Sequence, residues 1–384
     1  MMQQKSTIIH VLPHGKFQGG IEQLVFDTAN SLRRQNFNQI LLCEQNNFDE
    51  SFASVFDQVT HYIDESIDPN STIILCHDPM LALKYPSLLK YKVYLFVHDH
   101  NLVCIRKHKY YPVSKQICDE ALGFACIKNG CVVNRASDSI LGINFKSPLT
   151  NRKLISKLQQ NNVTFIVGSQ WMKRSLLKNK IKEESITVIN PITDQKTTPP
   201  RSETNRKNLL FVGQLVTGKG MDFLLHAITR VDQNTSLDII GDGVQRQDLE
   251  KLSKELGLQD RVVFHGKIAH EEVESYYQSS KILIVPSRWP EPFGMVGLEA
   301  MRHGMPVIAF DVGGIPEWLT DQKNGLLVKA GDVDGLANAV TSLLSNAQQY
   351  DAFSAAAHKT ASVELNHNKY ILDLLNVWGL ERAA

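Results

Sequence analysis

The 384-residue sequence predicts an α/β fold made of two doubly wound, Rossmann-like halves. Short apolar runs alternate with amphipathic stretches along the chain, one polar stretch with two adjacent prolines interrupts this alternation, and the alternation then restarts. The length suits two domains of ordinary size, each of which can bury a core. Ligands of such sheets bind beyond the carboxyl ends of the strands, so we expect the site in a cleft between the two halves.

The first half contains short apolar runs with strand character, followed by a strand, turn and helix pattern over 163–180. The strand-like runs are 6–12, 38–44, 71–77, 92–98 and 185–192. The stretch 21–35 between the first two runs has the apolar period of an amphipathic helix. The segment 193–208 is polar and has no apolar period, so it predicts a linker.

Beyond this linker the alternation gives six more strand-like runs, each separated from the next by a helical stretch. These runs are 208–213, 236–243, 261–266, 281–287, 305–311 and 324–328. We expect an N-terminal domain over residues 1–195 and a C-terminal domain over 205–365. A last helix over about residues 366–384 is expected to return to the first domain.

Composition and charge are those of an ordinary globular protein, with 43% apolar and 21% charged residues and a net charge of +1. The N-terminal apolar run is short for a signal peptide, and the sequence has no run of the ~20 apolar residues that cross a bilayer. We therefore expect a cytoplasmic protein with reduced cysteines.

The charge is unevenly distributed along the chain. Residues 84–182 carry 18 Lys and Arg against four acidic residues. This excess is interpreted either as a solvated basic face or as a surface for anionic partners such as phospholipid headgroups. The second interpretation predicts peripheral contact of the N-terminal domain with the inner face of a membrane. Nucleic acid is not expected as a partner, because no binding motif accompanies the charge.

A phosphate-loop pattern follows the first strand of the second half. Gly213, Gly218 and Lys219 have the G-x-x-x-x-G-K spacing of nucleoside triphosphatases, between a strand-like run and a helical one. "VIAFD" at 307–311 resembles the strand that holds magnesium in such enzymes. However, Gly220 replaces the Ser or Thr whose hydroxyl binds magnesium. The triphosphatase hypothesis therefore stays only as an alternative, and Lys219 remains a candidate phosphate ligand.

The segment 285–328 carries the most informative motif. Glu291 and Glu299 are separated by seven residues, and the block "GMPVIAFDVGGIPE" follows them. The helix that begins near Gly294 presents unpaired amides to an anion. Glu299 lies in its second turn, where a carboxylate can accept from ribose hydroxyls. Each carboxylate also has a simpler interpretation, as a charge that stabilises the start of the helix.

These motifs, together with "GGIEQL" near the N-terminus and "GDG" at 241–243, resemble retaining glycosyltransferases of family 4. Members have the GT-B architecture of two Rossmann-like domains, and the resemblance covers most of the chain. It implies an acceptor-side N-terminal domain, a C-terminal domain that binds a nucleotide sugar, and catalysis without a metal ion. It also implies catalytic roles for Glu291, Lys219 and His98.

The resemblance assigns further residues to donor binding. These are Gly19, Gly20, Gln214, Gly241, Gly266, Lys267, Phe293, Gly294, Met295, Val296 and Glu299. His98 ends the strand-like run 92–98, and His77, at the end of 71–77, is a second candidate. A histidine at a strand end is often only structural, and a Gly-Gly pair at a strand-to-helix turn is common.

One position departs from the family pattern. Relatives carry Arg in the "G-R-L" of the loop before Lys219, where this chain has Gln214. Gln donates hydrogen bonds without charge, so the departing diphosphate has one cation fewer. Another basic residue compensates, or the enzyme is slow or inactive on standard donors.

Four cysteines lie close together in a Lys-rich insertion over about residues 100–135. Their spacing, C-x13-C-x7-C-x4-C, places Cys104, Cys118, Cys126 and Cys131 within 28 residues. Four soft ligands in a segment with little core of its own suit a structural zinc. An iron–sulfur cluster and a group of free thiols are the alternatives.

The resemblance implies transfer of a sugar, with retention of configuration, from a nucleotide donor that we expect to be UDP-linked. The expected acceptor is a glycan or lipid-linked glycan of a cell-envelope polysaccharide, namely lipopolysaccharide, capsule or exopolysaccharide. The alternative is a GT-B enzyme of another class, such as a nucleotide-sugar epimerase, although the E-x7-E block and the "GGIEQL" loop argue against it.

Overall fold

The computed structural model describes residues 6–381 apart from 45–46, 65, 136–142 and 195–207. The chain forms two compact units. Unit 1 comprises Met1–Asp194 and His367–Ala384, and unit 2 comprises Gln195–Asn366. The predicted linker at 193–208 lies almost wholly outside the described residues.

Unit 1 is built on a seven-stranded parallel sheet with the order β3-β2-β1-β4-β5-β8-β9. The strands are β1 (Thr7–Val11), β2 (Asn38–Leu42), β3 (Gln58–Thr60), β4 (Thr72–Cys76), β5 (Lys92–Val97), β8 (Thr164–Val167) and β9 (Ile186–Val188). The strand order reverses between β1 and β4, and this reversal is the point at which ligands of doubly wound sheets bind.

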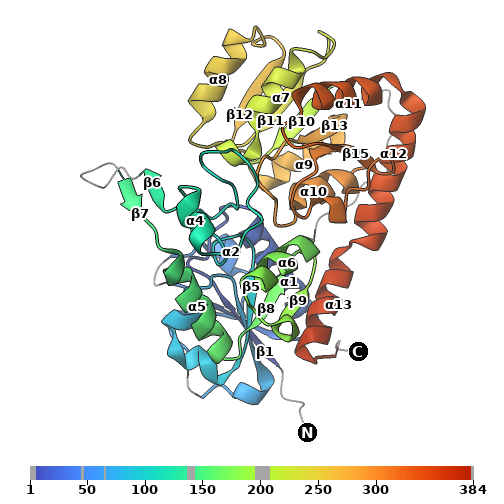
Figure 1. Ribbon diagram of the computed structural model, residues 1–384. Helices are drawn as coiled ribbons and strands as arrows, with labels where there is room; N and C mark the ends of the chain where they lie inside the picture. The colour runs from blue at the N-terminus through green and yellow to red at the C-terminus, as the bar shows by residue number, and fades with distance from the viewer. Residues whose placement is uncertain (1–5, 45–46, 65, 136–142, 195–207, 382–384) are drawn as a thin grey trace. The chain divides into compact units, whose positions relative to one another are not determined.

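Helices lie on both faces of this sheet (Figure 1). They are α1 (Gly20–Arg34), α2 (Glu50–Ala53), α3 (Leu81–Lys84), α4 (Phe124–Lys128), α5 (Pro148–Gln160), α6 (Gln170–Lys178) and α13 (His367–Trp378), with 3-10 turns at Pro69–Ser71, Pro86–Lys90 and Glu183–Ser185. A short antiparallel hairpin, β6 (Val133–Arg135) and β7 (Ile143–Phe145), stands outside the main sheet.

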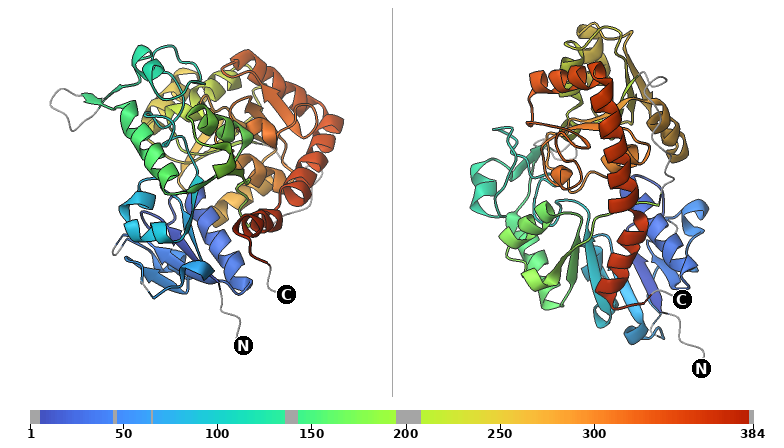
Figure 2. Two further views of the ribbon diagram at one scale, coloured as in Figure 1. Left: turned by 60° about the horizontal axis from the view of Figure 1, so that its bottom comes forward. Right: turned by 90° about the vertical axis from the view of Figure 1, so that its right-hand side faces the viewer.

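The last helix, α13, follows unit 2 in sequence and packs on unit 1. It lies next to α1 (Figure 2). Thr28 Oγ1 of α1 lies 3.0 Å from the Tyr370 hydroxyl, and Ser31 Oγ lies 2.8 Å from His367 Nε2. These hydrogen bonds, one buried and one part-buried, fix the register of one helix against the other.

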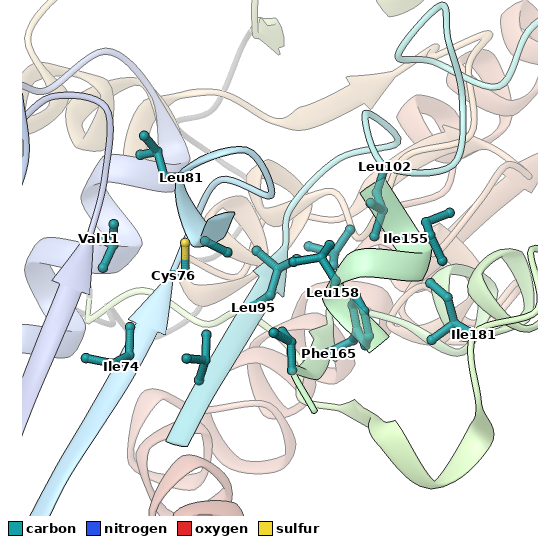
Figure 3. Close-up of a cluster of buried hydrophobic side chains, with 14 of the residues drawn as sticks. Val11, Ile74, Cys76, Leu81, Leu95, Leu102, Ile155, Leu158, Phe165 and Ile181 are labelled. Atoms are coloured by element: carbon teal, nitrogen blue, oxygen red, sulfur yellow. The ribbon is translucent and has the colours of Figure 1, made fainter. Parts of the chain in front are cut away.

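The larger core of unit 1 lies on the opposite face of the sheet from α1 and α13. Alternate side chains of the central strands, among them Val11, Ile74 and Leu95, pack with Ile155 and Leu158 of α5 (Figure 3). Side chains of a strand alternate between its faces, so the residues between these ones point to the face covered by α1. That second face carries the candidate histidines.

Unit 2 repeats the same plan with six parallel strands in the order β12-β11-β10-β13-β14-β15. The strands are β10 (Leu209–Val212), β11 (Leu237–Ile240), β12 (Val262–Gly266), β13 (Ile282–Val285), β14 (Val307–Phe310) and β15 (Gly325–Val328). The helices are α7 (Met221–Ile228), α8 (Arg246–Glu255), α9 (His270–Ser279), α10 (Met295–Arg302), α11 (Val333–Ser345) and α12 (Ala347–Lys359), with 3-10 turns at Thr217–Lys219 and Ile315–Glu317 and a π-helical turn at Thr360–Glu364. Here the order reverses between β10 and β13.

The predicted fold class, two doubly wound α/β domains, is confirmed. Each strand-like run predicted from the sequence contains a strand of one of the two main sheets. The sequence analysis missed β3 and the β6–β7 hairpin, whose strands have only three residues each. Runs of three residues are too short to show a period of two.

Candidate functional site

Two loops meet at the point in unit 2 where the strand order reverses. One follows β10 and ends in Lys219 and Gly220, and the other follows β13. Gly220 has a left-handed backbone (φ 68°), and a Cβ there would lie 1.9 Å from the carbonyl oxygen of Pro286. The amide of Arg288 donates to the Gly218 carbonyl at 2.9 Å. The glycines therefore allow the two loops to pack directly against each other.

This packing brings two predicted catalytic side chains together. Lys219 Nζ lies 2.8 Å from Glu291 Oε1, and the Ser287 hydroxyl donates to the same oxygen at 2.5 Å. The Glu291 side chain is 13% exposed and that of Lys219 is 32% exposed. Because both groups remain partly accessible, a ligand with its own anion and hydroxyls can reach them. Ser287 was not among the predicted site residues.

The helix α10 begins directly beyond Glu291. Gly294 is its N-cap with a left-handed backbone (φ 88°), so the predicted anion-binding amides of Gly294, Met295 and Val296 lie at the start of the helix. Trp318 orients this end, since its Nε1 donates to the carbonyl of buried Phe293 at 2.6 Å. A Cβ on Gly297 would lie 2.0 Å from the Trp318 ring. Phe293 thus supports the loop rather than presenting its side chain to solvent.

Glu299 accepts a hydrogen bond from a residue that the sequence analysis did not identify. The hydroxyl of Tyr277, on α9, donates to Glu299 Oε2 at 2.9 Å. Burial, and then the negative charge of Glu299, raise the pKa of Tyr277 well above its ordinary value. Tyr277 therefore stays a donor and orients the Glu299 carboxylate.

Three glycines close the carboxyl ends of neighbouring strands, and two of them, Gly241 and Gly266, were predicted to bind the donor. The Gly213 amide donates to the Ile240 carbonyl at 3.0 Å, and that of Gly241 donates to the Gly266 carbonyl at 2.8 Å. A Cβ on Gly241 would lie 1.9 Å from the Gly213 carbonyl oxygen. Larger side chains would therefore push these turns apart.

Around these glycines the polar side chains are exposed. Gln214 and Lys267 are both exposed to solvent. Arg246, at the start of α8, lies next to Gly266 and pairs with Asp242 and Glu250 at 3.0 and 2.8 Å. Arg246 is a further cation at this edge that sequence motifs did not indicate.

The remaining predicted residues belong to unit 1. Gly19 is the N-cap of α1 and, with Gly20, is exposed. The Gly19 backbone is extended (φ −173°), a conformation open to any residue, so backbone strain does not require glycine there. His98 follows β5, and its Nε2 lies 2.8 Å from His77 Nδ1. That these residues share one site with Lys219 and Glu291 remains a prediction.

The four cysteines of the insertion lie near one another. Burial raises the pKa of Cys131 to about 12, with a further contribution from the thiols of Cys126, Cys104 and Cys118. The Lys109 amide donates to Cys104 Sγ at 3.4 Å. Within the described residues, however, no group of three or more His, Cys, Asp or Glu side chains is arranged to hold a metal ion. The predicted zinc or iron–sulfur site is therefore not supported, and none of the four cysteines forms a disulfide.

No helix among the described residues is long and apolar enough to cross a membrane.

Comparison with known proteins identifies the family of the second unit. Residues 193–360 match the family described as "Glycosyl transferases group 1". The chain thus carries the group 1 domain, and the predicted relationship to family 4 glycosyltransferases is confirmed.

Two relatives illustrate this similarity. An uncharacterized glycosyltransferase of Methanocaldococcus jannaschii is 33% identical over 197 residues, which is 50% of each chain. An uncharacterized protein encoded in the cps region of Klebsiella pneumoniae is 38% identical over 140 residues, 36% of each chain. The chain thus matches at most half the length of these relatives.

The fold resembles that of solved structures along nearly the whole chain. Anabaena HepE, crystallised with UDP and glucose, gives a TM-score of 0.73 at 17% identity, covering 97% of this chain and 99% of the other. At this identity the similarity shows the fold alone, and it confirms the predicted GT-B class.

Proposed function

We propose that this protein is a retaining glycosyltransferase that transfers a sugar from a nucleoside-diphosphate donor to a glycan acceptor. The observation that carries the proposal is the Lys219–Glu291 ion pair, 2.8 Å long, where the strand order of unit 2 reverses and α10 begins. A diphosphate needs cations and amide donors, and a sugar needs an acceptor for its hydroxyls. This arrangement offers all three together.

Each residue has a defined task in this reaction. Lys219 and the amides of residues 294–296 stabilise the negative charge that develops on the departing diphosphate. When Lys219 turns to the diphosphate, a hydroxyl of the transferred sugar takes its place as a donor to Glu291 Oε1. Glu299, held by Tyr277, accepts from the ribose hydroxyls.

The chemical step exchanges one carbon–oxygen bond for another. The bond from the anomeric carbon to the diphosphate oxygen breaks, and a bond to the acceptor oxygen forms on the same face. The acceptor hydroxyl gives its proton to the departing phosphate oxygen. No described side chain has to act as a covalent nucleophile, which agrees with the front-side attack expected for the family.

We propose UDP as the nucleotide and a cell-envelope polysaccharide as the acceptor. HepE, which shares the fold, was crystallised with UDP and glucose, and a relative is encoded in a cps region. A panel of UDP-, GDP- and ADP-sugars, with and without envelope glycans, tests this by release of free nucleotide. We expect acceptor-dependent release of UDP. Formation of an epimerised sugar nucleotide, or no release from any donor, would contradict the proposal.

We further propose that unit 1 contacts an anionic membrane surface on the cytoplasmic side. Phe124 and Ile127 of α4 are 78% and 57% exposed, and Val113 and Phe145 nearby in sequence are 79% and 68% exposed. These apolar side chains lie within the basic region 84–182, a combination that suits the anionic inner leaflet. Sedimentation with anionic and with neutral vesicles tests it: Phe124→Glu should reduce binding to the anionic vesicles, and equal binding by wild type and variant would contradict it.

A further inference from the structure

Three histidines lie side by side at the carboxyl ends of three neighbouring strands of unit 1. His10 belongs to β1, His77 follows β4 and His98 follows β5, and the sheet order is β1-β4-β5. His10 pairs in register with Leu75, and Leu75 pairs with Tyr94. His77 lies two residues beyond Leu75, and His98 lies four residues beyond Tyr94. Residues separated by two or four positions in a strand share a face, so all three rings point to the face covered by α1.

The three rings are nearly parallel to one another, and we call them the histidine row. The centroids of His10 and His77 are 5.9 Å apart, and those of His77 and His98 are 5.1 Å apart, with interplanar angles of 2° and 14°. Because His77 Nδ1 and His98 Nε2 are only 2.8 Å apart, these two rings lie edge to edge rather than face to face. Phe96 stacks on His98 at 4.4 Å. These contacts leave little rotational freedom to the His98 ring, and its position at the reversal of the strand order is the expected place for a ligand.

A single hydrogen bond joins two rings of the histidine row. His77 Nδ1 lies 2.8 Å from His98 Nε2, so one of these nitrogens carries a proton and the other accepts it. His77 Nε2 is buried and has no hydrogen-bond partner within the described part of the chain. If His98 donated, neutral His77 would carry its proton on that buried Nε2, and a buried N–H without an acceptor is rare and costly. If His77 donates, only an acceptor nitrogen is left unpaired.

Both rings are neutral near pH 7. Burial lowers the pKa of His98 to about 3, and burial together with its neighbours His98 and His10 lowers the pKa of His77 well below the ordinary value. Each ring therefore carries one N–H proton, so either His77 or His98 donates the hydrogen bond between them.

We propose that His77 is a positioning residue whose Nδ1–H holds His98 in the tautomer protonated on Nδ1. His98 then presents an N–H donor, with its Nε2 already engaged, to an oxygen of the donor sugar. This role of His98 toward the donor sugar rests on the proposed function, whereas the tautomer itself does not. Sequence motifs indicated both histidines separately, and the bond between them appears only in the fold.

Long-range ¹H–¹⁵N NMR correlation of the full chain labelled with ¹⁵N-histidine tests the tautomer directly, with His98→Gln to assign the His98 signals. We expect a protonated Nδ1 and a bare Nε2 on His98 in the wild type. A protonated Nε2 on His98 in the wild type would overturn the proposal, and this result needs no variant of His77 to fold.

Two variants separate the effect of the hydrogen bond from that of the ring contacts. His77→Phe keeps a ring and loses the Nδ1–H, so the His98 tautomer should change, and kcat/KM for the donor should fall about tenfold, the scale of one lost hydrogen bond. His77→Asn places an amide donor near the position of Nδ1, so it should keep the tautomer and stay within about threefold of the wild type. The KM for the acceptor should be unchanged in both.

The outcomes distinguish failure of this inference from failure of the proposed function. An unchanged His98 tautomer in His77→Phe would overturn the positioning role, whatever the activity. A protein that turns over no nucleotide sugar but shows the expected NMR signals would contradict the proposed function and leave the His77–His98 pair established.

Discussion

The ion pair between Lys219 and Glu291 is the centre of the site at the scale of single residues. In our proposal the two side chains separate on donor binding and act on different parts of the donor, the diphosphate and the sugar. Their contributions to the stability of the transition state should therefore be independent of each other and of the ion pair between them.

Lys219→Ala and Glu291→Ala should each lower turnover roughly 100-fold or more, the scale of losing one stabiliser of the transition state. The double variant should lose approximately the product of the two effects. Lys251→Ala, which removes an exposed lysine paired with Glu255 on α8, is the matched control and should be near wild type. Steady-state kinetics with the preferred donor measure these turnover rates. A double variant whose turnover is as high as that of either single variant would show that the two side chains act only through their ion pair.

Gln214 gives a second prediction at this scale. It is exposed in the loop that ends in Lys219, at the position where the family pattern predicts an Arg. Gln214→Arg should raise kcat roughly tenfold, because a charged donor stabilises a leaving diphosphate more than a neutral amide does. Gln214→Met, which adds bulk without charge, is the control. An unchanged rate in Gln214→Arg would mean that another cation, such as Arg246, already compensates.

At the scale of elements, the start of α10 depends on the contact between Gly297 and Trp318. A Cβ on Gly297 would lie 2.0 Å from the ring, so Gly297→Ala should destabilise unit 2 by roughly 1–3 kcal/mol. It should also weaken donor binding, because Trp318 holds the Phe293 carbonyl at the N-terminus of α10. Thermal unfolding and donor titration measure both effects. Trp318→Phe should partly rescue Gly297→Ala, and a variant as stable as the wild type would refute the packing argument.

Particular elements show how far sequence reasoning reaches. Lys219 follows β10 and Glu291 follows β13, the two strands between which the order of the unit 2 sheet reverses. Strand patterns and motifs in the sequence were therefore sufficient to predict that both residues lie at the same edge of the sheet. Tyr277 and Ser287 could not be predicted as site residues. Their hydroxyls orient Glu299 and Glu291, and only the fold brings each hydroxyl to its carboxylate. The cysteine spacing suggested a zinc ligand set, but spacing alone does not determine whether four thiols converge on one point.

At the scale of the whole molecule, the histidine row makes unit 1 sensitive to acid. Burial lowers the pKa of His10 from 6.5 to about 4. Between pH 6.5 and about pH 4, His10 is protonated in the unfolded chain but not in the folded chain. The free energy of unfolding therefore has its full value above pH 6.5 and decreases as the pH falls. His77 and His98 act in the same direction.

We expect unit 1 to lose roughly 1–2 kcal/mol from His10 alone between pH 7 and pH 5. Hydrogen exchange of β1, β4 and β5 at the two pH values measures the loss, with β10 and β13 of unit 2 as internal controls. His10→Asn should show a smaller loss. Equal protection of β1, β4 and β5 at both pH values, after correction for intrinsic exchange, would contradict the prediction.

The most direct test of the account is the affinity of UDP and of uridine for the wild type and for Lys219→Ala, measured by isothermal titration calorimetry. If Lys219 binds the diphosphate, Lys219→Ala weakens UDP binding roughly tenfold or more and leaves uridine binding unchanged. Glu291→Ala, which removes the carboxylate that competes for Lys219, should bind UDP at least as tightly as the wild type. Absence of UDP binding in the wild type, or equal loss of UDP and uridine affinity in Lys219→Ala, would contradict the assignment of this site.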